Sequence, residues 1–251
     1  MPEAAGKAGA SPYEILENGY NVVMERGFDF AEATVGLVMN LTETEVEKAS
    51  RSLKFEMFNS FIPPSLPIAA TPLDTLTEYA EKAMRRVKAL GASGVVFGSG
   101  AARRIPDGST WENIRKFIIM CGGSAEKYGL FVALEPLNSH ETNWLTTVRE
   151  GFEICEELNL PSIKLLADAF HMAKENESPL ILPQATKFLA HIHVSDADRG
   201  YPGRDGGEYL KTIAGILNQT GYRNGISAEC GYGDFTAESK YIYKFMKEVF
   251  T

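Results

Sequence analysis

Four short apolar runs in the second half of the sequence each carry a carboxylate or an imidazole near their end. The runs are LFVALEP with Glu135, SIKLLADA with Asp168, LAHIHVSD with His191 and His193, and GISAEC with Glu229. Residues i and i+2 of a strand share a face, and the apolar residues between them take the other face. If the four runs are neighbouring strands, their polar side chains therefore meet on one side.

Three carboxylates that converge on an imidazole away from water repel one another unless a cation lies between them. One divalent metal ion would remove this conflict. A ligand set of oxygens with one imidazole suits Mn²⁺, Mg²⁺, Co²⁺ or Zn²⁺, and the sequence does not choose among them. Because His193 lies closer to the end of its run, we expect His191 one layer lower, hydrogen-bonded to a ligand.

The strands that must position these residues alternate with stretches of helical periodicity. Helix starts are marked by Ser11-Pro12 and by Thr42 with Glu45. We predict seven strands, at Phe28–Gly36, Lys54–Phe61, Gly94–Ser99, Leu130–Pro136, Ser162–Ala169, Leu189–Asp196 and Gly225–Cys230. We predict helices at Tyr13–Arg26, Glu43–Ser52, Leu73–Leu90, Trp111–Tyr128, from near Asn143 to Leu158, at Gly207–Gln219 and at Thr236–Val249.

Repeated β-then-α units with apolar strands predict a parallel sheet with helical crossovers. Their number in a chain of about 250 residues is typical of an α/β protein with a single (β/α)8 TIM barrel. Closure needs an eighth strand, for which Ala4–Ala10 is the only candidate, although it has few β-branched residues. The competing fold, a doubly wound open sheet, is disfavoured because no GxGxxG follows the first strand. No linker divides residues 1–251, so we expect one domain.

The composition excludes several kinds of partner. The net charge is −8, with 33 acidic and 25 basic residues, which disfavours binding to nucleic-acid phosphates. The three cysteines form no CxxC pair, so neither a disulfide framework nor a zinc finger is expected. The sequence lacks an apolar run long enough to cross a membrane, and its N-terminus lacks an apolar secretion signal. We therefore expect a cytoplasmic protein with a small-molecule substrate and no nucleic-acid or membrane partner. A homo-oligomer is compatible with the sequence.

The sequence resembles the xylose-isomerase-like TIM barrels, the sugar phosphate isomerases and epimerases that include D-tagatose 3-epimerase. The resemblance runs from about Phe28 to the end of the chain. It is carried by VVFGSGAARRIPDG, VALEPLNSHETNW, LLADAFHM, HIHVSDADR and ISAEC, in the family's order. It implies a metal site formed by Glu135, Asp168, His193 and Glu229.

The resemblance also implies roles in catalysis and substrate binding. Two of the metal-binding glutamates, Glu135 and Glu229, would act as the acid/base pair. Contacts to the substrate oxygens would come from His171 and Arg199, and Glu141 would be a further carboxylate near the substrate.

The implied activity is the metal-dependent epimerisation or isomerisation of a ketose. One glutamate would remove the proton beside the carbonyl to give an enediolate, and the other would return a proton to the opposite face. A keto-acid isomerase of the hydroxypyruvate type and an inosose-type dehydratase stay open, because they begin with the same proton abstraction. A metal-dependent abasic-site endonuclease fits poorly, since the chain has only four histidines. A non-catalytic sugar-binding protein would not need all of these positions intact.

Some of these residues have ordinary structural alternatives. Asp168 could cap the helix that begins near His171, a role that does not exclude metal binding. Glu135 could simply end its strand in a surface loop. Arg103 and Arg104 follow the glycine-rich FGSG, so they could reach an acidic group on the substrate or cover the end of the barrel.

Overall fold

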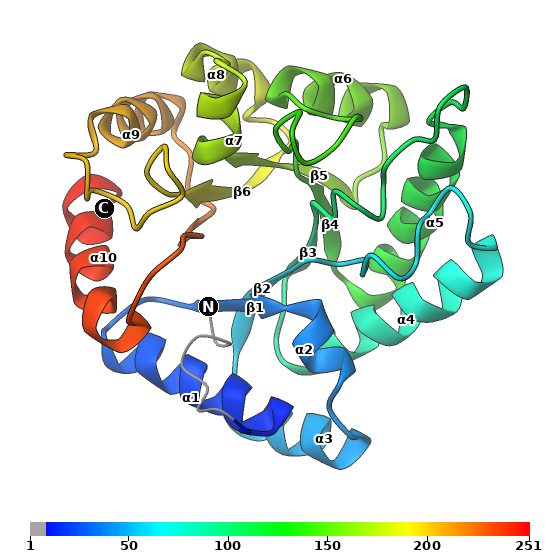
Figure 1. The fold of residues 1–251 in the computed structure, drawn as a ribbon, viewed down its shortest axis with the longest axis horizontal. Coiled ribbons are helices and arrows are strands. Elements are labelled where there is room, and N and C mark those ends of the chain that lie inside the picture. Colours follow the sequence, from blue (N-terminus) through cyan, green and yellow to red (C-terminus); the bar gives the residue numbers. More distant parts are fainter. Residues whose placement is uncertain (1–8) are drawn as a thin grey trace.

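A computed structural model describes residues 9–251 of the chain. Seven parallel strands pair in chain order and form a nearly closed barrel, with the helices outside it (Figure 1). The predicted TIM barrel is therefore confirmed. The eighth strand expected at Ala4–Ala10 falls almost entirely outside the described residues. The strands are β1 (Ala31–Thr34), β2 (Phe55–Asn59), β3 (Gly94–Phe97), β4 (Phe131–Leu134), β5 (Ile163–Asp168), β6 (Leu189–Val194) and β7 (Gly225–Ala228).

The helices follow the predicted order, and several begin at the predicted caps. Ser11 and Glu14 form a capping box for the first helix, as Thr42 and Glu45 do for the third. The helices are α1 (Pro12–Glu25), α2 (Val35–Met39), α3 (Glu43–Ser52), α4 (Leu73–Ala89), α5 (Glu112–Tyr128), α6 (Val148–Leu158), α7 (Ala169–Lys174), η2 (Pro179–Ile181), α8 (Leu182–Ala185), α9 (Glu208–Thr220) and α10 (Phe235–Val249).

The strands have a small inner core and a larger outer one. Met57, Val96, Ala133 and Leu166 form a separate buried cluster inside the barrel. The alternate residues of the same strands pack outward against the helices in the main core, as Leu165 does on β5. This period of two is the alternation that the sequence predicted, and it fixes which side chains enter the barrel.

Several predicted boundaries differ from the observed ones, and two of the differences have a clear structural cause. The first strand ends at Thr34 rather than at Gly36, because the Thr34 hydroxyl accepts a hydrogen bond from the Leu37 N–H and begins α2. Helix α6 begins at Val148 rather than near Asn143. The Asn143 side chain instead binds the backbone N–H and carbonyl of Ile105 and so ties two loops together.

In the described part of the chain, every helix is too short or too polar to cross a lipid bilayer. The sequence pattern led to the same expectation.

Candidate active site

Four of the polar residues predicted to face inward lie together at the carboxyl ends of β4 to β7. Asp168 ends β5 and His193 is the penultimate residue of β6, whereas Glu135 and Glu229 follow β4 and β7 directly. Each offers one nitrogen or oxygen atom to the cluster, and these atoms all lie within 4.8 Å of one another. The barrel therefore brings together residues that are up to 94 positions apart, from 135 to 229.

Hydrogen bonds and ion pairs connect the members of this cluster. His193 Nδ1 lies 3.3 Å from Glu135 Oε1 and 3.1 Å from Glu229 Oε2. The Arg199 guanidinium pairs with Asp168 Oδ2 at 2.5 Å and also with Glu229. Side chains of Asp168 and His193 are fully buried, and that of Glu229 is 20% exposed. The cluster is thus largely shielded from water, and Glu229 is its most solvent-accessible member.

The ionisable groups change one another's pKa values. Burial by itself would lower the pKa of His193, but Glu32 and Glu229 raise it well above its usual value. Burial raises the pKa of Glu135, with a further rise from Glu229, although a hydrogen bond from His193 opposes it. Burial would also raise the pKa of Glu229, but His193 and Arg199 lower it to about 2. Positive charge on His193 and Arg199 therefore balances the converging carboxylates.

The donor set fits one divalent metal ion. Three carboxylates and one imidazole provide hard oxygen ligands and a nitrogen, which suits ions such as Mn²⁺, Mg²⁺, Co²⁺ and Zn²⁺. The closeness of the four donor atoms allows a single ion to contact all of them. A divalent charge at this place would also relieve the mutual repulsion of Glu135, Asp168 and Glu229.

Asp168 both caps a helix and lies in the cluster, the two positions that the sequence analysis found compatible. Its Oδ1 accepts a hydrogen bond from the Phe170 N–H at 2.8 Å and caps α7, while its Oδ2 pairs with Arg199 beside the cluster. The cap begins α7 directly at the end of β5, so His171 lies one turn further along, with Nε2 at 3.8 Å from Asp168 Oδ2. His171 Nδ1 accepts the Asn138 backbone N–H at 3.1 Å. A neutral His171 ring therefore carries its hydrogen on Nε2, the nitrogen nearer the cluster.

The three predicted substrate contacts have different settings. Arg199 lies in the loop after β6 with a positive φ of 66°, and its guanidinium stacks 4.7 Å from the centre of the Phe170 ring. Glu141 is half exposed, and its Oε1 accepts a hydrogen bond from Asn138 Nδ2 at 2.7 Å. It lies 4.0 Å from His171 Nδ1. His171 and Arg199 thus reach the cluster directly, whereas Glu141 stands at its edge.

Two polar residues that the sequence analysis overlooked also reach the cluster, both from the first strands. Glu32 on β1 contacts His193 Nε2 at 3.0 Å, and Asn59 on β2 donates through Nδ2 to Glu229 Oε1 at 2.8 Å. The sequence does indicate the position of Glu32, because the alternation of residues i and i+2 places Ala31 and Ala33 on the outer face of the strand and Glu32 on the inner face.

Contact with an acidic group of the substrate, one of the two roles left open for Arg103, does not fit the structure. Its side chain is completely buried. Its Nη1 donates to the carbonyls of Phe97 and Glu135 at 3.1 and 2.7 Å, and Nη2 donates to the Leu145 carbonyl at 3.1 Å. Arg103 therefore fixes the backbone at the ends of β3 and β4, including the residue that carries the Glu135 carboxylate.

Comparison with known proteins decides the family. Residues 16–248 match the model of the xylose isomerase-like TIM barrel family. The chain belongs to this family. The match spans all seven described strands and every residue of the cluster.

Several relatives of this chain are named as sugar epimerases. A ketose 3-epimerase from Arthrobacter globiformis is 35% identical over 100 residues, which cover 39% of this chain and 34% of that protein. An L-ribulose 3-epimerase from Methylomonas sp. (strain DH-1) is 30% identical over 160 residues, or 61% of this chain and 54% of that protein. The chain thus matches about a third to a half of the length of these relatives.

Solved structures support the fold over almost the whole chain. A crystal structure of D-allulose 3-epimerase from Methylomonas sp. in complex with D-allulose superposes with a TM-score of 0.81. It is 19% identical and covers 96% of this chain and 93% of that chain. At this identity the likeness concerns the barrel itself.

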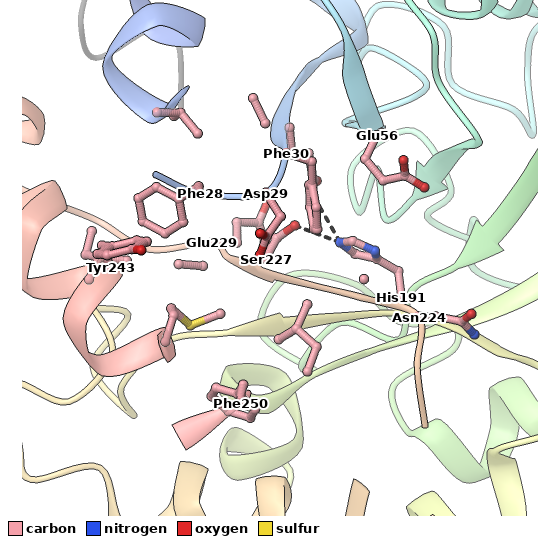
Figure 2. Close-up of a pocket in the computed structure, with 18 of the residues that line it drawn as sticks. Phe28, Asp29, Phe30, Glu56, His191, Asn224, Ser227, Glu229, Tyr243 and Phe250 are labelled. Atoms are coloured by element: carbon pink, nitrogen blue, oxygen red, sulfur yellow. Dashed lines mark hydrogen bonds and ion pairs between the residues drawn. The ribbon is translucent and has the colours of Figure 1, made fainter. Parts of the chain in front are cut away.

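This xylose isomerase-like barrel also has a cavity of about 990 Å³ between β1, β7 and α10. Aromatic residues such as Phe28, Tyr243 and Phe250 line it together with His191 and Glu229 (Figure 2). The cavity lies where β1 and β7 do not pair among the described strands. It brings Glu229 of the cluster to a cavity that both apolar and charged side chains line.

Proposed function

We propose that this protein is a single-domain, divalent-metal-dependent ketose epimerase that acts on the carbon beside the carbonyl. The observation that carries the proposal is the convergence of Glu135, Asp168, His193 and Glu229 at the carboxyl ends of four neighbouring barrel strands. TIM-barrel enzymes place their chemistry at these strand ends. The epimerase relatives support a ketose as the substrate.

Epimerisation needs a base on one face of the carbon and a proton donor on the other. Glu135 and Glu229 come from strands that are three apart in the sheet order, so they approach the centre of the barrel from different sides. In the proposed reaction one glutamate takes the C3 proton to leave an enediolate, and the other gives a proton to the opposite face. When the other epimer is the substrate, the two glutamates would exchange the roles of base and acid.

The remaining residues hold the substrate and the ion. The four clustered residues would bind one divalent ion, which would supply Lewis acidity to the carbonyl and the neighbouring hydroxyl oxygen. His171 Nδ1 accepts the Asn138 N–H, so Nε2 is the nitrogen that can donate a hydrogen to a substrate oxygen. The Arg199 guanidinium can donate to a second oxygen and stabilise the negative charge that develops there. Glu141 would contact the outer end of the substrate.

The test is to incubate Mn²⁺-loaded protein in D₂O with D-fructose, D-allulose or L-ribulose and to follow the sugars by NMR. We expect deuterium at C3 together with the C3 epimer, and removal of the metal with a chelator should abolish both. Deuterium at C1 with an aldose product would instead indicate an isomerase. Loss of water from the substrate would indicate a dehydratase. No exchange with any ketose by metal-loaded protein contradicts the proposal.

Gly98 provides a separate test of the position of Glu135. A Cβ atom at residue 98 would lie 2.1 Å from Glu135 Oε2, so Gly98→Ala must displace this carboxylate. Because the displaced group is the end of a flexible side chain, the fold should survive. We expect the Kd for Mn²⁺, measured by calorimetry, to rise about 10-fold or more.

The control is Gly123→Ala on α5, where a Cβ atom would meet nothing within 4 Å. This variant should bind Mn²⁺ like the wild type. Unchanged Mn²⁺ affinity in a folded Gly98→Ala protein would argue against Glu135 as a ligand.

A further inference from the structure

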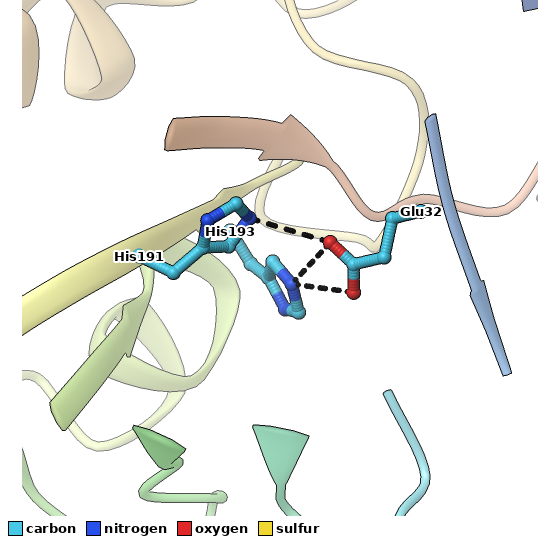
Figure 3. A group of neighbouring side chains, drawn as sticks. All are labelled: Glu32, His191 and His193. Atoms are coloured by element: carbon cyan, nitrogen blue, oxygen red, sulfur yellow. Dashed lines mark hydrogen bonds and ion pairs between the residues drawn. The ribbon is translucent and has the colours of Figure 1, made fainter. Parts of the chain in front are cut away.

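Glu32 lies outside the proposed ligand set but contacts one of its members. From β1, its carboxylate oxygens lie 3.0 and 3.2 Å from His193 Nε2, and one of them lies 3.3 Å from His191 Nε2 (Figure 3). The Glu32 side chain is only 7% exposed. A buried carboxylate needs partners, and within the described residues these two imidazoles are the partners that the structure shows.

The two nitrogens of His193 face different groups. Nδ1 points to the cluster, at 3.1 Å from Glu229 Oε2 and 3.3 Å from Glu135 Oε1. Nε2 points to Glu32. A histidine that binds a metal must offer a nitrogen without hydrogen, and the hydrogen bond of the other nitrogen decides which one that is. A carboxylate can only accept, so Glu32 favours the hydrogen on Nε2 and leaves Nδ1 free for an ion.

We propose that Glu32 is a positioning residue of the metal centre, which fixes the ring and the tautomer of His193. This inference rests on the proposed function, because it assumes that the cluster binds a divalent ion. Metal-binding histidines commonly donate their second N–H to a carboxylate, which orients the ring and makes it a better ligand. Here that carboxylate comes from the first described strand, on the opposite side of the open edge from β7.

His191 completes this arrangement from the neighbouring inner layer. Its Nε2 lies 2.7 Å from Ser227 Oγ, and its ring meets the His193 ring nearly at right angles, with centroids 5.4 Å apart. His191 thus pairs with the Glu32 carboxylate and the Ser227 hydroxyl, and it meets the cluster only through the edge contact between its ring and that of His193. The expectation that His191 hydrogen-bonds to a ligand is wrong, because its partners are Glu32 and Ser227.

Glu32, His191 and His193 could also be read as a second metal site, since their donor atoms are close enough. His193 would then have to bind an ion through each nitrogen. The positioning role requires a single ion for each chain, so the stoichiometry of metal binding separates the two interpretations.

The experiment is a calorimetric titration of metal-free protein with Co²⁺. We expect one ion for each wild-type chain, and in Glu32→Gln a Kd that is about 10- to 100-fold higher. The matched control is Glu56→Gln, because Glu56 lines the same cavity and has no contact with His193. Its Kd should stay within about 2-fold of the wild type, well below the loss expected for an orienting carboxylate. Equal Kd values for Glu32→Gln and the wild type, or two ions for each wild-type chain, would overturn the proposal.

A second readout uses the wild-type protein and so does not depend on how Glu32→Gln folds. In the Co²⁺ form, the Nε2–H of a bound His193 should give a strongly shifted proton resonance in H₂O that is absent in D₂O. In Glu32→Gln this resonance should exchange faster and broaden. A wild-type protein that binds Co²⁺ without such a resonance contradicts the role of Glu32 alone. A wild-type protein that binds no divalent ion contradicts the proposed function as well.

Discussion

Glu229→Gln is expected to lower kcat for epimerisation by about 1,000-fold, because general acid–base catalysis contributes on the order of 10²- to 10⁴-fold. The side chain contacts Asn59 and Arg199 and is the most accessible of the clustered groups. Glutamine keeps its size and one oxygen, so the fold and the hydrogen bond from Asn59 should survive. What is lost is the ability to exchange a proton with the substrate, together with the negative charge that Glu229 offers to Arg199 and to the ion.

A half-reaction makes this test specific. Each epimer of a ketose presents its C3 hydrogen to a different face, so the wild type should exchange deuterium into both epimers. With Glu135 intact and Mn²⁺ saturating, Glu229→Gln should exchange the hydrogen of only one epimer and form almost none of the other. Glu248→Gln removes the same charge from an exposed position on α10 and should behave like the wild type. A Glu229→Gln enzyme that epimerises at the wild-type rate contradicts the acid/base role.

Arg103→Met is expected to have the largest effect on stability, at about 3 kcal/mol, since hydrogen bonds from a charged group contribute roughly 1.5–3 kcal/mol each. Arg103 is fully buried and donates to three backbone carbonyls, those of Phe97 and Glu135 at the ends of β3 and β4 and that of Leu145 in the loop before α6. Methionine fills a similar space without donating. The methionine variant no longer buries a charge, which offsets part of the loss. The expected loss in the free energy of unfolding is therefore smaller than the sum of three such hydrogen bonds.

The measurement is a thermal unfolding scan. A loss of about 3 kcal/mol in a chain of this size should lower Tm by roughly 6–12 °C. The neighbouring Arg104 is exposed and provides the control, because Arg104→Met removes the same charge from the same loop. Its Tm should stay close to that of the wild type. If both variants unfold at the wild-type temperature, the carbonyl contacts of Arg103 contribute little to the barrel.

The barrel and its four central residues follow from local patterns. Buried parallel strands force a period of two, since any residue beside an outward-facing apolar side chain must point into the barrel. Glu135 and Asp168 are therefore placed by Leu134 and Ala167, which pack against the helices. The same rule applies to Glu32, whose neighbours Ala31 and Ala33 lie in the outer core.

Which of these groups touch one another depends on barrel closure, and no local pattern contains that information. Arg103 and Arg104 follow the same glycine-rich turn, yet Arg103 is buried and donates to three carbonyls, whereas Arg104 is exposed. Glu32 meets His193 across 161 residues of sequence because the sheet is curved into a barrel, which brings β1 close to β6. Face and order along a strand are local properties of the chain, whereas partners across the barrel are set by its curvature and the packing of all its strands.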